Sequence, residues 1–165
     1  MDIEKISLER IQTLHPFIRE EVKTAYLHIN KNILGKGIKM CITQALRTFK
    51  EQDELFKKKP KVTNAKGGQS IHNFGLAFDF ALFYDRDNNG TFESLSWSLV
   101  EDFDKDGMAD WLEVAKYLKS IGYTWGGDWK FHDAPHFEKT GYKWRDLLKK
   151  HNNKEFITGT TYVNI

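Results

Sequence analysis

Cysteine is almost absent from this chain, since Cys41 is the only one among 165 residues. A single thiol forms no disulfide within the chain and builds no thiolate metal cluster. Any zinc ion would therefore be held by histidine and carboxylate side chains, its other common ligands. The histidines and acids of the sequence are accordingly where a metal site is to be sought.

Long apolar runs are lacking as well. No stretch approaches the roughly 20 consecutive apolar residues that a membrane-spanning helix needs, so we expect no membrane insertion. The first five residues, Met-Asp-Ile-Glu-Lys, contain no apolar core of the kind that a secretory signal peptide carries. We therefore expect synthesis in the cytoplasm without a signal peptide.

An excess of charge of one sign is also missing. The chain has 25 Lys and Arg against 23 Asp and Glu, which leaves a net charge of +2. So small an excess does not predict binding to nucleic acid, and we expect no nucleic-acid partner. The hydrophobic fraction of 40% and the charged fraction of 29% are typical of one globular domain with its own core. We expect that domain to be a monomer.

Hydrophobic periodicity and turn residues predict a single compact α+β domain over residues 1–165. A helical N-terminal part (1–37) is expected to pack on a small, mainly antiparallel sheet in the core (38–145), with a closing segment at 146–165. Ser7 is the expected N-cap of the first helix, and Thr48 with Glu51 forms a capping-box pattern. Helices are expected at 7–14, 16–33, 49–58, 111–121 and 144–150, and strands at 38–43, 77–84, 123–125, 135–138 and 160–165.

The stretch 68–79 runs from a glycine-bearing loop into an apolar strand and carries two potential metal ligands, His72 and Asp79. Side chains alternate between the faces of a strand, so Asp79 shares its face with Ala77 and Ala81. The two alanines leave open space above the carboxylate. A buried carboxylate is costly unless something neutralises it. This pattern is typical of the base of a metal-binding or substrate-binding site.

A second stretch, 129–138, carries the remaining candidates. If residues 135–138 are extended, His136 and Glu138 share a face, and Asp133 lies three residues before His136. A catalytic zinc ion commonly has three protein ligands and one open position. His72, Asp79 and His136 are therefore candidate zinc ligands, with Asp133 placed as a general base. Spacing alone leaves open that these are unrelated core or surface residues. The other histidines are expected to be structural or without a role: His15, His28, His132 and His151.

Two motifs point to a known family. The run Ser70-x-His72-x-x-Gly75-x-Ala77-x-Asp79 resembles the signature of the D-Ala-D-Ala carboxypeptidase (VanY-like) zinc peptidases. The run at 125–138, Trp-Gly-Gly-Asp-Trp-Lys-x-x-Asp-x-Pro-His-Phe-Glu, is similar to the second signature of one branch. That branch is the L-alanyl-D-glutamate endopeptidases found among phage endolysins. The resemblance covers roughly residues 38 to 145.

The resemblance implies roles for individual residues. It implies a zinc ion held by His72, Asp79 and His136, with Asp133 as the catalytic base where many relatives carry glutamate. The family's arginine after the first strand holds a substrate carboxylate and polarises the scissile bond, and Arg47 occupies the matching position. Ser70 matches a serine that lies near the substrate.

The function expected from the resemblance is zinc-dependent hydrolysis of bacterial peptidoglycan stem peptides, at the bond between L-Ala and D-Glu. Two alternatives stay open: a D,D- or L,D-carboxypeptidase acting on the same peptides, and a non-catalytic calcium-binding cell-wall module. In each case the protein would act on the cell wall. Without a signal peptide it would arrive there by phage-type release through a membrane pore or by another route of export.

The acidic stretch 102–113 fits a twelve-position EF-hand calcium loop. Carboxylates stand at positions one, three, five, nine and twelve, and glycine stands at position six, where the sharp turn needs it. The alternative is a solvated acidic turn that caps the following helix through Asp110. We favour a calcium site, whose candidate ligands are Asp102, Asp104, Asp106, Met108, Asp110 and Glu113. The earlier acidic loop at 85–96 has Ser96 at position twelve and lacks the bidentate carboxylate.

Overall fold

A computed structural model describes residues 2–165 as five α-helices and five β-strands, joined by loops and three short helical turns. The helices are α1 (Ile3–Gln12), α2 (Pro16–His28), α3 (Phe49–Lys57), α4 (Asp110–Ser120) and α5 (Trp144–Asn152). The strands are β1 (Ile38–Gln44), β2 (Ala77–Tyr84), β3 (Ser94–Ser96), β4 (Tyr123–Trp125) and β5 (His136–Lys139). The predicted α+β class is confirmed.

The strands form one antiparallel sheet in the order β1-β2-β5-β4, with β3 paired to β2 off this path. β5 pairs with the first residues of β2, and β3 pairs with its last residues. On the other edge of β2, the ladder with β1 is irregular between Ile42 and Gln44, opposite Asp79. Such bulges are frequent next to active sites, because they redirect side chains.

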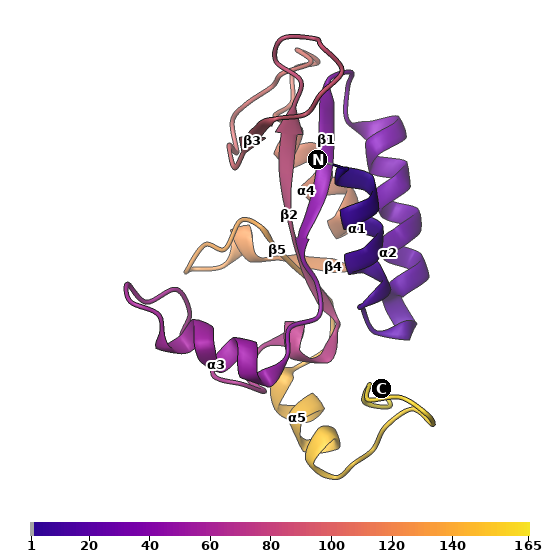
Figure 1. The fold of residues 1–165 in the computed structure, drawn as a ribbon, viewed down its shortest axis with the longest axis vertical. Helices are drawn as coiled ribbons and strands as arrows, with labels where there is room; N and C mark the ends of the chain where they lie inside the picture. The colour runs from indigo at the N-terminus through magenta and orange to yellow at the C-terminus, as the bar shows by residue number, and fades with distance from the viewer. Residues whose placement is uncertain (1) are drawn as a thin grey trace.

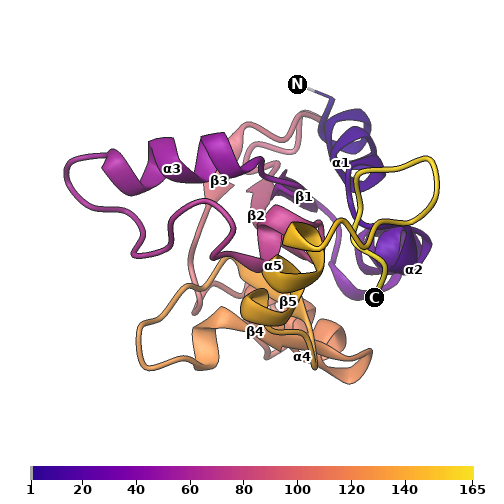
Figure 2. The ribbon, with the colours of Figure 1, turned by 90° about the horizontal axis from the view of Figure 1, so that it is seen from below.

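Helices cover the sheet and enclose the core. α1 packs against β1, α2 lies beside α1, and α4 packs beside β4 (Figure 1). An aromatic layer fills the space under the sheet, where Phe80 stacks on Trp111 with ring centroids 4.4 Å apart and also packs against Phe137. α3 and α5 lie at the end of the sheet opposite β3, on either side of the turn that enters β2 (Figures 1 and 2).

The N-terminal helix begins earlier than the sequence predicted. α1 starts at Ile3 because Asp2 is its N-cap and accepts a hydrogen bond from the Lys5 amide at 2.9 Å. The prediction that Ser7 caps the helix was wrong. Ser7 lies within α1, fully buried, and its hydroxyl accepts a hydrogen bond from the Ile42 amide of β1 at 3.1 Å. The serine therefore joins helix to sheet.

The C-terminal segment also differs from expectation. The strand predicted at 160–165 is absent from the described residues, where a single isolated bridge joins Phe156 to Val163. The short strand β3 was not predicted, because its three residues are too few to show a periodicity. The helix predicted over 16–33 forms as α2 followed by a π-helical turn, Ile29–Ile33. The capping box at Thr48 is confirmed at the start of α3.

Candidate metal centre

A short 3₁₀ turn, Ile71–Phe74, places His72 directly before β2. The turn ends at Gly75, whose φ of 70° is left-handed and therefore suits glycine. His72 is 2% exposed, and its Nδ1 lies 2.8 Å from the carbonyl oxygen of Ala45. A carbonyl only accepts, so Nδ1 carries the hydrogen and Nε2 presents a lone pair to the cleft.

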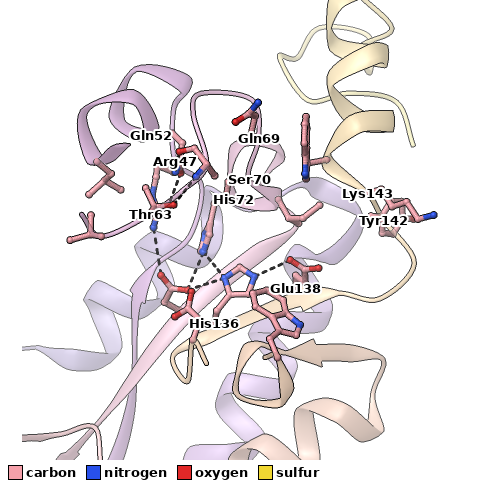
Figure 3. Close-up of a pocket in the computed structure, with 18 of the residues that line it drawn as sticks. Arg47, Gln52, Thr63, Gln69, Ser70, His72, His136, Glu138, Tyr142 and Lys143 are labelled. Carbon is pink, nitrogen blue, oxygen red and sulfur yellow. Dashed lines mark hydrogen bonds and ion pairs between the residues drawn. The ribbon is translucent and has the colours of Figure 1, made fainter. Parts of the chain in front are cut away.

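Asp79 and His136 face each other across the sheet, because they are directly paired residues of β2 and β5. Asp79 Oδ1 lies 3.0 Å from His72 Nε2 and 3.3 Å from His136 Nδ1. The two imidazole nitrogens lie 3.1 Å apart. The three predicted ligands thus come from two strands and a turn and converge on one point (Figure 3).

The dimensions of this triangle fit a zinc ion. Zinc bonds of 2.0–2.1 Å in tetrahedral geometry place neighbouring ligand atoms about 3.3 Å apart. The three observed separations, 3.0 to 3.3 Å, are close to that edge length. Two imidazoles and one carboxylate also form a donor set that zinc commonly uses at catalytic sites. The residues present therefore fit the metal that their pattern predicted.

The charges of the site are strongly coupled. Burial opposes ionisation of Asp79, but His72 and His136 outweigh it and hold the pKa of this carboxyl far below its usual range. Burial likewise opposes the charged form of His136, yet its hydrogen bonds with Asp79 and Glu138 raise its pKa to about 9. The site therefore holds a carboxylate ready for a cation, and a metal ion would displace the proton of His136.

The three ligands lie at the floor of a cleft of about 620 Å³, a size typical of small-molecule and peptide sites. Asp133, Arg47 and Ser70 line the same cleft, so the structure brings every predicted zinc-site residue together. Asp133 as a whole residue is exposed, but desolvation of its carboxyl group, followed by the charge of Asp79, raises its pKa. That direction is the one expected of a carboxylate that must accept a proton near neutral pH.

Arg47 follows β1 and reaches the metal ligands from the side of α3. Its Nη2 lies 3.6 Å from Asp79 Oδ2, and its Nη1 donates a hydrogen bond to Gln52 Oε1 at 3.0 Å. Gln52 was missed by sequence analysis. It is 1% exposed, and its amide nitrogen donates to the Ala65 carbonyl in the loop after α3. The sequence could have indicated Gln52, because it is a polar residue on the inward-facing side of the amphipathic helix α3.

Three further residues of the cleft were not assigned a role from sequence. The Trp129 ring packs on His136 with centroids 5.1 Å apart, and Tyr142 lines the same cleft shortly before α5. Glu138 Oε2 lies 2.9 Å from His136 Nε2. The histidines set aside as structural or idle lie away from the three ligands. Among them, His15 caps α2, and His132 is exposed with Nδ1 bonded to the Gly127 carbonyl.

The acidic loop at 102–113 also gathers its side chains. Two groups of carboxylates could each surround a cation: Asp102, Asp104 and Asp106 in one, and Asp104, Asp110 and Glu113 in the other. Glu113 Oε2 is buried without a hydrogen-bond partner. Burial and the charges of Asp106 and Asp104 raise the pKa of Glu113 to about 7. Asp110 is only partly available, because it accepts hydrogen bonds from the Tyr84 hydroxyl and the Phe103 amide.

Comparisons with known proteins bear on the cleft. The sequence profile of a family described as D-alanyl-D-alanine carboxypeptidase, among the M15 peptidases, matches residues 63–139. The chain is 43% identical over 131 residues to the peptidoglycan L-alanyl-D-glutamate endopeptidase CwlK of Bacillus subtilis (strain 168). This alignment spans 76% of the chain and 72% of CwlK. The chain belongs to the M15 peptidase family.

Members of this family are zinc-dependent, so the chain is a metallopeptidase. A structural likeness agrees on the fold. The crystal structure of the L-Ala D-Glu endopeptidase ChiX of Serratia marcescens superposes with a TM-score of 0.55 at 20% identity. The likeness covers 87% of this chain and 90% of ChiX. Within residues 2–165, no helix is both long and apolar enough to traverse a lipid bilayer.

Proposed function

We propose that the protein hydrolyses the bond between L-Ala and D-Glu in peptidoglycan stem peptides. The observation that carries the proposal is the convergence of two imidazoles, two carboxylates and a guanidinium in one cleft. The similarity to CwlK, which is named for that bond, supports the choice of substrate. The cleft then supplies a site for a Lewis-acidic metal ion, a carboxylate that can act as the base and a guanidinium that can bind an anion.

We assign zinc binding to His72, Asp79 and His136. Bound there, zinc supplies a Lewis acid for the scissile carbonyl and lowers the pKa of a water molecule to about 7. The half-buried Asp79 would then have a neutralising partner, which explains how a carboxylate is tolerated between Ala77 and Ala81. The two histidines would contribute no charge, so zinc and its three ligands would together carry a net positive charge that favours the developing oxyanion.

Asp133 is assigned as the general base. It lines the cleft with the metal ligands, and its amide is anchored to the Gly126 carbonyl at 3.0 Å. The raised pKa of Asp133 suits a group that takes a proton from the attacking water. The same carboxyl can then pass that proton to the amine of the leaving D-Glu residue, so the proton balance closes within one side chain.

Arg47 is assigned to substrate binding and to charge stabilisation. Its guanidinium lies at the edge of the metal ligands and is held by Gln52, so it can meet a carboxylate or a developing oxyanion with little reorganisation. The stem peptide offers such a carboxylate on D-Glu. Ser70 lines the same wall and is assigned to contact the peptide backbone.

The alternative within the same chemistry is a D,D- or L,D-carboxypeptidase acting on these peptides. The matched family profile carries the carboxypeptidase description, which is the observation that keeps this alternative. The non-catalytic module considered from the sequence is set aside, because the family is one of peptidases.

Digestion of purified peptidoglycan with mass analysis of the products separates these activities. An L-Ala–D-Glu endopeptidase releases peptides that begin with D-Glu and leaves L-Ala on the glycan strand. A carboxypeptidase instead releases single D-amino acids. A parallel digestion with a chelator, followed by zinc addition, tests the metal requirement. Release of free D-Ala as the sole product would contradict the proposed bond.

We also propose that the loop at 102–113 binds calcium. Its backbone supports the assignment, because Asp102 accepts hydrogen bonds from the amides of Asp106 and Gly107 and so closes the turn around the carboxylates. The partnerless Glu113 oxygen supports it as well. Calorimetric titration should show one calcium ion per chain, bound at micromolar to millimolar concentration. Absence of heat at millimolar calcium would contradict the site.

We propose, finally, that the protein acts on the cell wall as a monomer after phage-type release. Expression in bacteria with and without a pore-forming phage protein tests the route. Lysis that depends on the pore supports it, whereas lysis without the pore indicates another export path.

A further inference from the structure

We propose that Glu138 is a positioning residue of the metal site, which fixes His136 so that its Nδ1 atom faces the ion. The inference rests on the proposed zinc site. Neither the sequence motifs nor the relatives' names assign Glu138 a role. The geometry that carries the inference is a chain of three groups across β2 and β5: Asp79, His136 and Glu138.

The two nitrogens of His136 have different neighbours. Nδ1 faces the cleft, 3.3 Å from Asp79 Oδ1 and 3.1 Å from His72 Nε2. Nε2 faces the opposite way and lies 2.9 Å from Glu138 Oε2 (Figure 3). Strand alternation produces this contact, because residues two apart in β5 point to the same side of the sheet.

A neutral imidazole carries one hydrogen, and the group beside each nitrogen decides which one carries it. An ionised carboxylate only accepts hydrogen bonds, so Glu138 draws the hydrogen of His136 to Nε2. Nδ1 is then left with the lone pair that a metal ion needs. Carboxylates placed in this way orient metal-bound histidines and raise their basicity in many metalloproteins.

His72 shows the complementary arrangement. Its Nδ1 donates to the backbone carbonyl of Ala45, and its Nε2 faces the cleft. The two histidines therefore present opposite nitrogens to one point, and each is fixed by an acceptor behind it. For His72 the acceptor belongs to the main chain and no mutation removes it. For His136 the acceptor is a side chain, so its contribution can be measured.

The surroundings of Glu138 leave His136 as the charged group with which it interacts. Its side chain is 20% exposed at the edge of the cleft, and within residues 2–165 its only cationic partner closer than 4.0 Å is His136. Its neighbours in the ladder are Ala77 of β2 and Thr124 of β4, neither of which is charged. Among the described residues, removal of the carboxylate therefore breaks no ion pair other than the one with His136.

The test is the zinc affinity of the metal-free protein, measured by competition with a chromophoric chelator. We expect Glu138→Ala to weaken zinc binding by about 10- to 100-fold, the usual effect of losing such a partner. Glu138→Gln keeps a neutral acceptor and should recover part of that loss. Glu21→Gln is the matched control, because it removes one carboxylate that bonds Tyr123 and Lys139 instead, and it should leave zinc affinity unchanged.

The kinetics of the zinc-saturated variants complete the test. A residue that only positions His136 should change zinc affinity while KM on a soluble stem peptide stays near the wild-type value. Unchanged zinc affinity in Glu138→Ala would overturn the inference, and a raised KM in that case would make Glu138 a substrate contact. If Glu138→Ala fails to fold, Glu138→Leu removes the acceptor while keeping most of the side-chain volume, and wild-type zinc affinity in that variant would overturn the inference equally.

Failure of this inference is distinguishable from failure of the proposed function. Wild-type protein that binds zinc tightly and cleaves the peptide, with Glu138→Ala behaving likewise, removes only the role of Glu138. Wild-type protein that binds no zinc removes the metal site and this inference together.

Discussion

The cleft and the acidic loop at 102–113 both gather carboxylates around a point, but they do so in opposite ways. In the cleft, His72, Asp79 and His136 come from a turn and two strands, up to 64 residues apart in sequence. Each outer nitrogen of the two histidines is bonded to a fixed acceptor. In the loop, the candidate ligands lie within twelve consecutive residues, and several carboxylates face one another.

The two groups of side chains differ in their electrostatic interactions when no metal ion is bound. The triangle of candidate zinc ligands holds one carboxylate, Asp79, beside two imidazoles, so opposite charges attract and the fold preorganises the triangle. The loop holds carboxylates of like charge, and the pKa of Glu113 is raised first by burial and then by repulsion from Asp106 and Asp104. We therefore expect zinc to change the cleft little in shape, whereas calcium should stabilise the loop and the start of α4.

The largest effect should come from His72→Ala. Removing this ligand leaves two protein ligands, so we expect loss of zinc and hydrolysis at the background rate. Metal analysis together with an assay on purified peptidoglycan measures both. His132→Ala is the matched control, because that exposed histidine bonds only a loop carbonyl and should retain zinc and activity. Full zinc occupancy in His72→Ala would contradict its role as a ligand.

Asp133→Asn should separate metal binding from catalysis. The amide has nearly the shape of the carboxyl but accepts no proton, so we expect zinc to be retained while kcat falls by about 10²- to 10⁴-fold. Metal content and kcat on a soluble stem peptide are measured together. Asp128→Asn, an acid of the same segment paired with Lys119 at the surface, serves as control. Near-native turnover in Asp133→Asn would remove the residue from the mechanism.

Gln52→Ala tests the support of Arg47. The substitution removes the acceptor of Arg47 Nη1 and also frees the Ala65 carbonyl. A hydrogen bond to a charged group contributes about 1.5–3 kcal/mol, so we expect kcat/KM to fall by roughly tenfold or more with zinc affinity unchanged. The readout is steady-state kinetics beside a zinc titration. Equal loss of zinc affinity would mean that Gln52 supports the metal ligands themselves.

Glu113→Gln tests the loop without touching the cleft. Calcium at 100 times its Kd stabilises a folded protein by about 2.7 kcal/mol, which for a chain of this size raises Tm by roughly 5–10 °C. We expect the wild-type protein to show that rise and Glu113→Gln to show much less. Glu93→Gln, in the other acidic loop, is the control. An equal rise in all three proteins would place calcium elsewhere.

The smallest effect concerns the link between the C-terminal segment and α2. Burial lowers the pKa of His15, whose Nε2 donates to the Val163 carbonyl while Nδ1 accepts from the Phe17 amide. A lowered histidine pKa means that the unfolded chain takes up the proton first. The contribution of His15 to the free energy of unfolding should therefore be fully present above pH 6.5 and be lost as the pH falls below that value. Chemical denaturation of wild type and His15→Gln compares the two slopes, and equal slopes would contradict the assignment.

What the sequence predicted well was local. The spacing of His72 and Asp79, the capping box at Thr48 and the glycine of the acidic loop each depend on a few neighbouring residues, so their patterns are visible in one line of text. His136 was a candidate ligand from its spacing to Asp133 and Glu138, and the family motif strengthened that prediction. Its pairing with Asp79 became visible only in the sheet register.

What the sequence did not predict depends on long-range packing. The buried position of Ser7 follows from contact with β1, and the anchoring of Arg47 follows from an inward-facing Gln52. The last residues resembled a strand because β-branched and aromatic residues are frequent there. Within the described residues they form a single bridge between Phe156 and Val163, and none of them joins the sheet. Contacts between residues far apart in sequence, such as these, form only once the whole chain has folded.

The most direct test of the central claim is a zinc titration of the metal-free protein, followed by hydrolysis of a soluble stem peptide. The account predicts that cleavage between L-Ala and D-Glu rises linearly and reaches its maximum at one zinc ion per chain, with His72→Ala inactive throughout. Cleavage by the fully metal-free protein, or a maximum that His72→Ala also reaches, would contradict the assignment of His72, Asp79 and His136 as the catalytic metal centre.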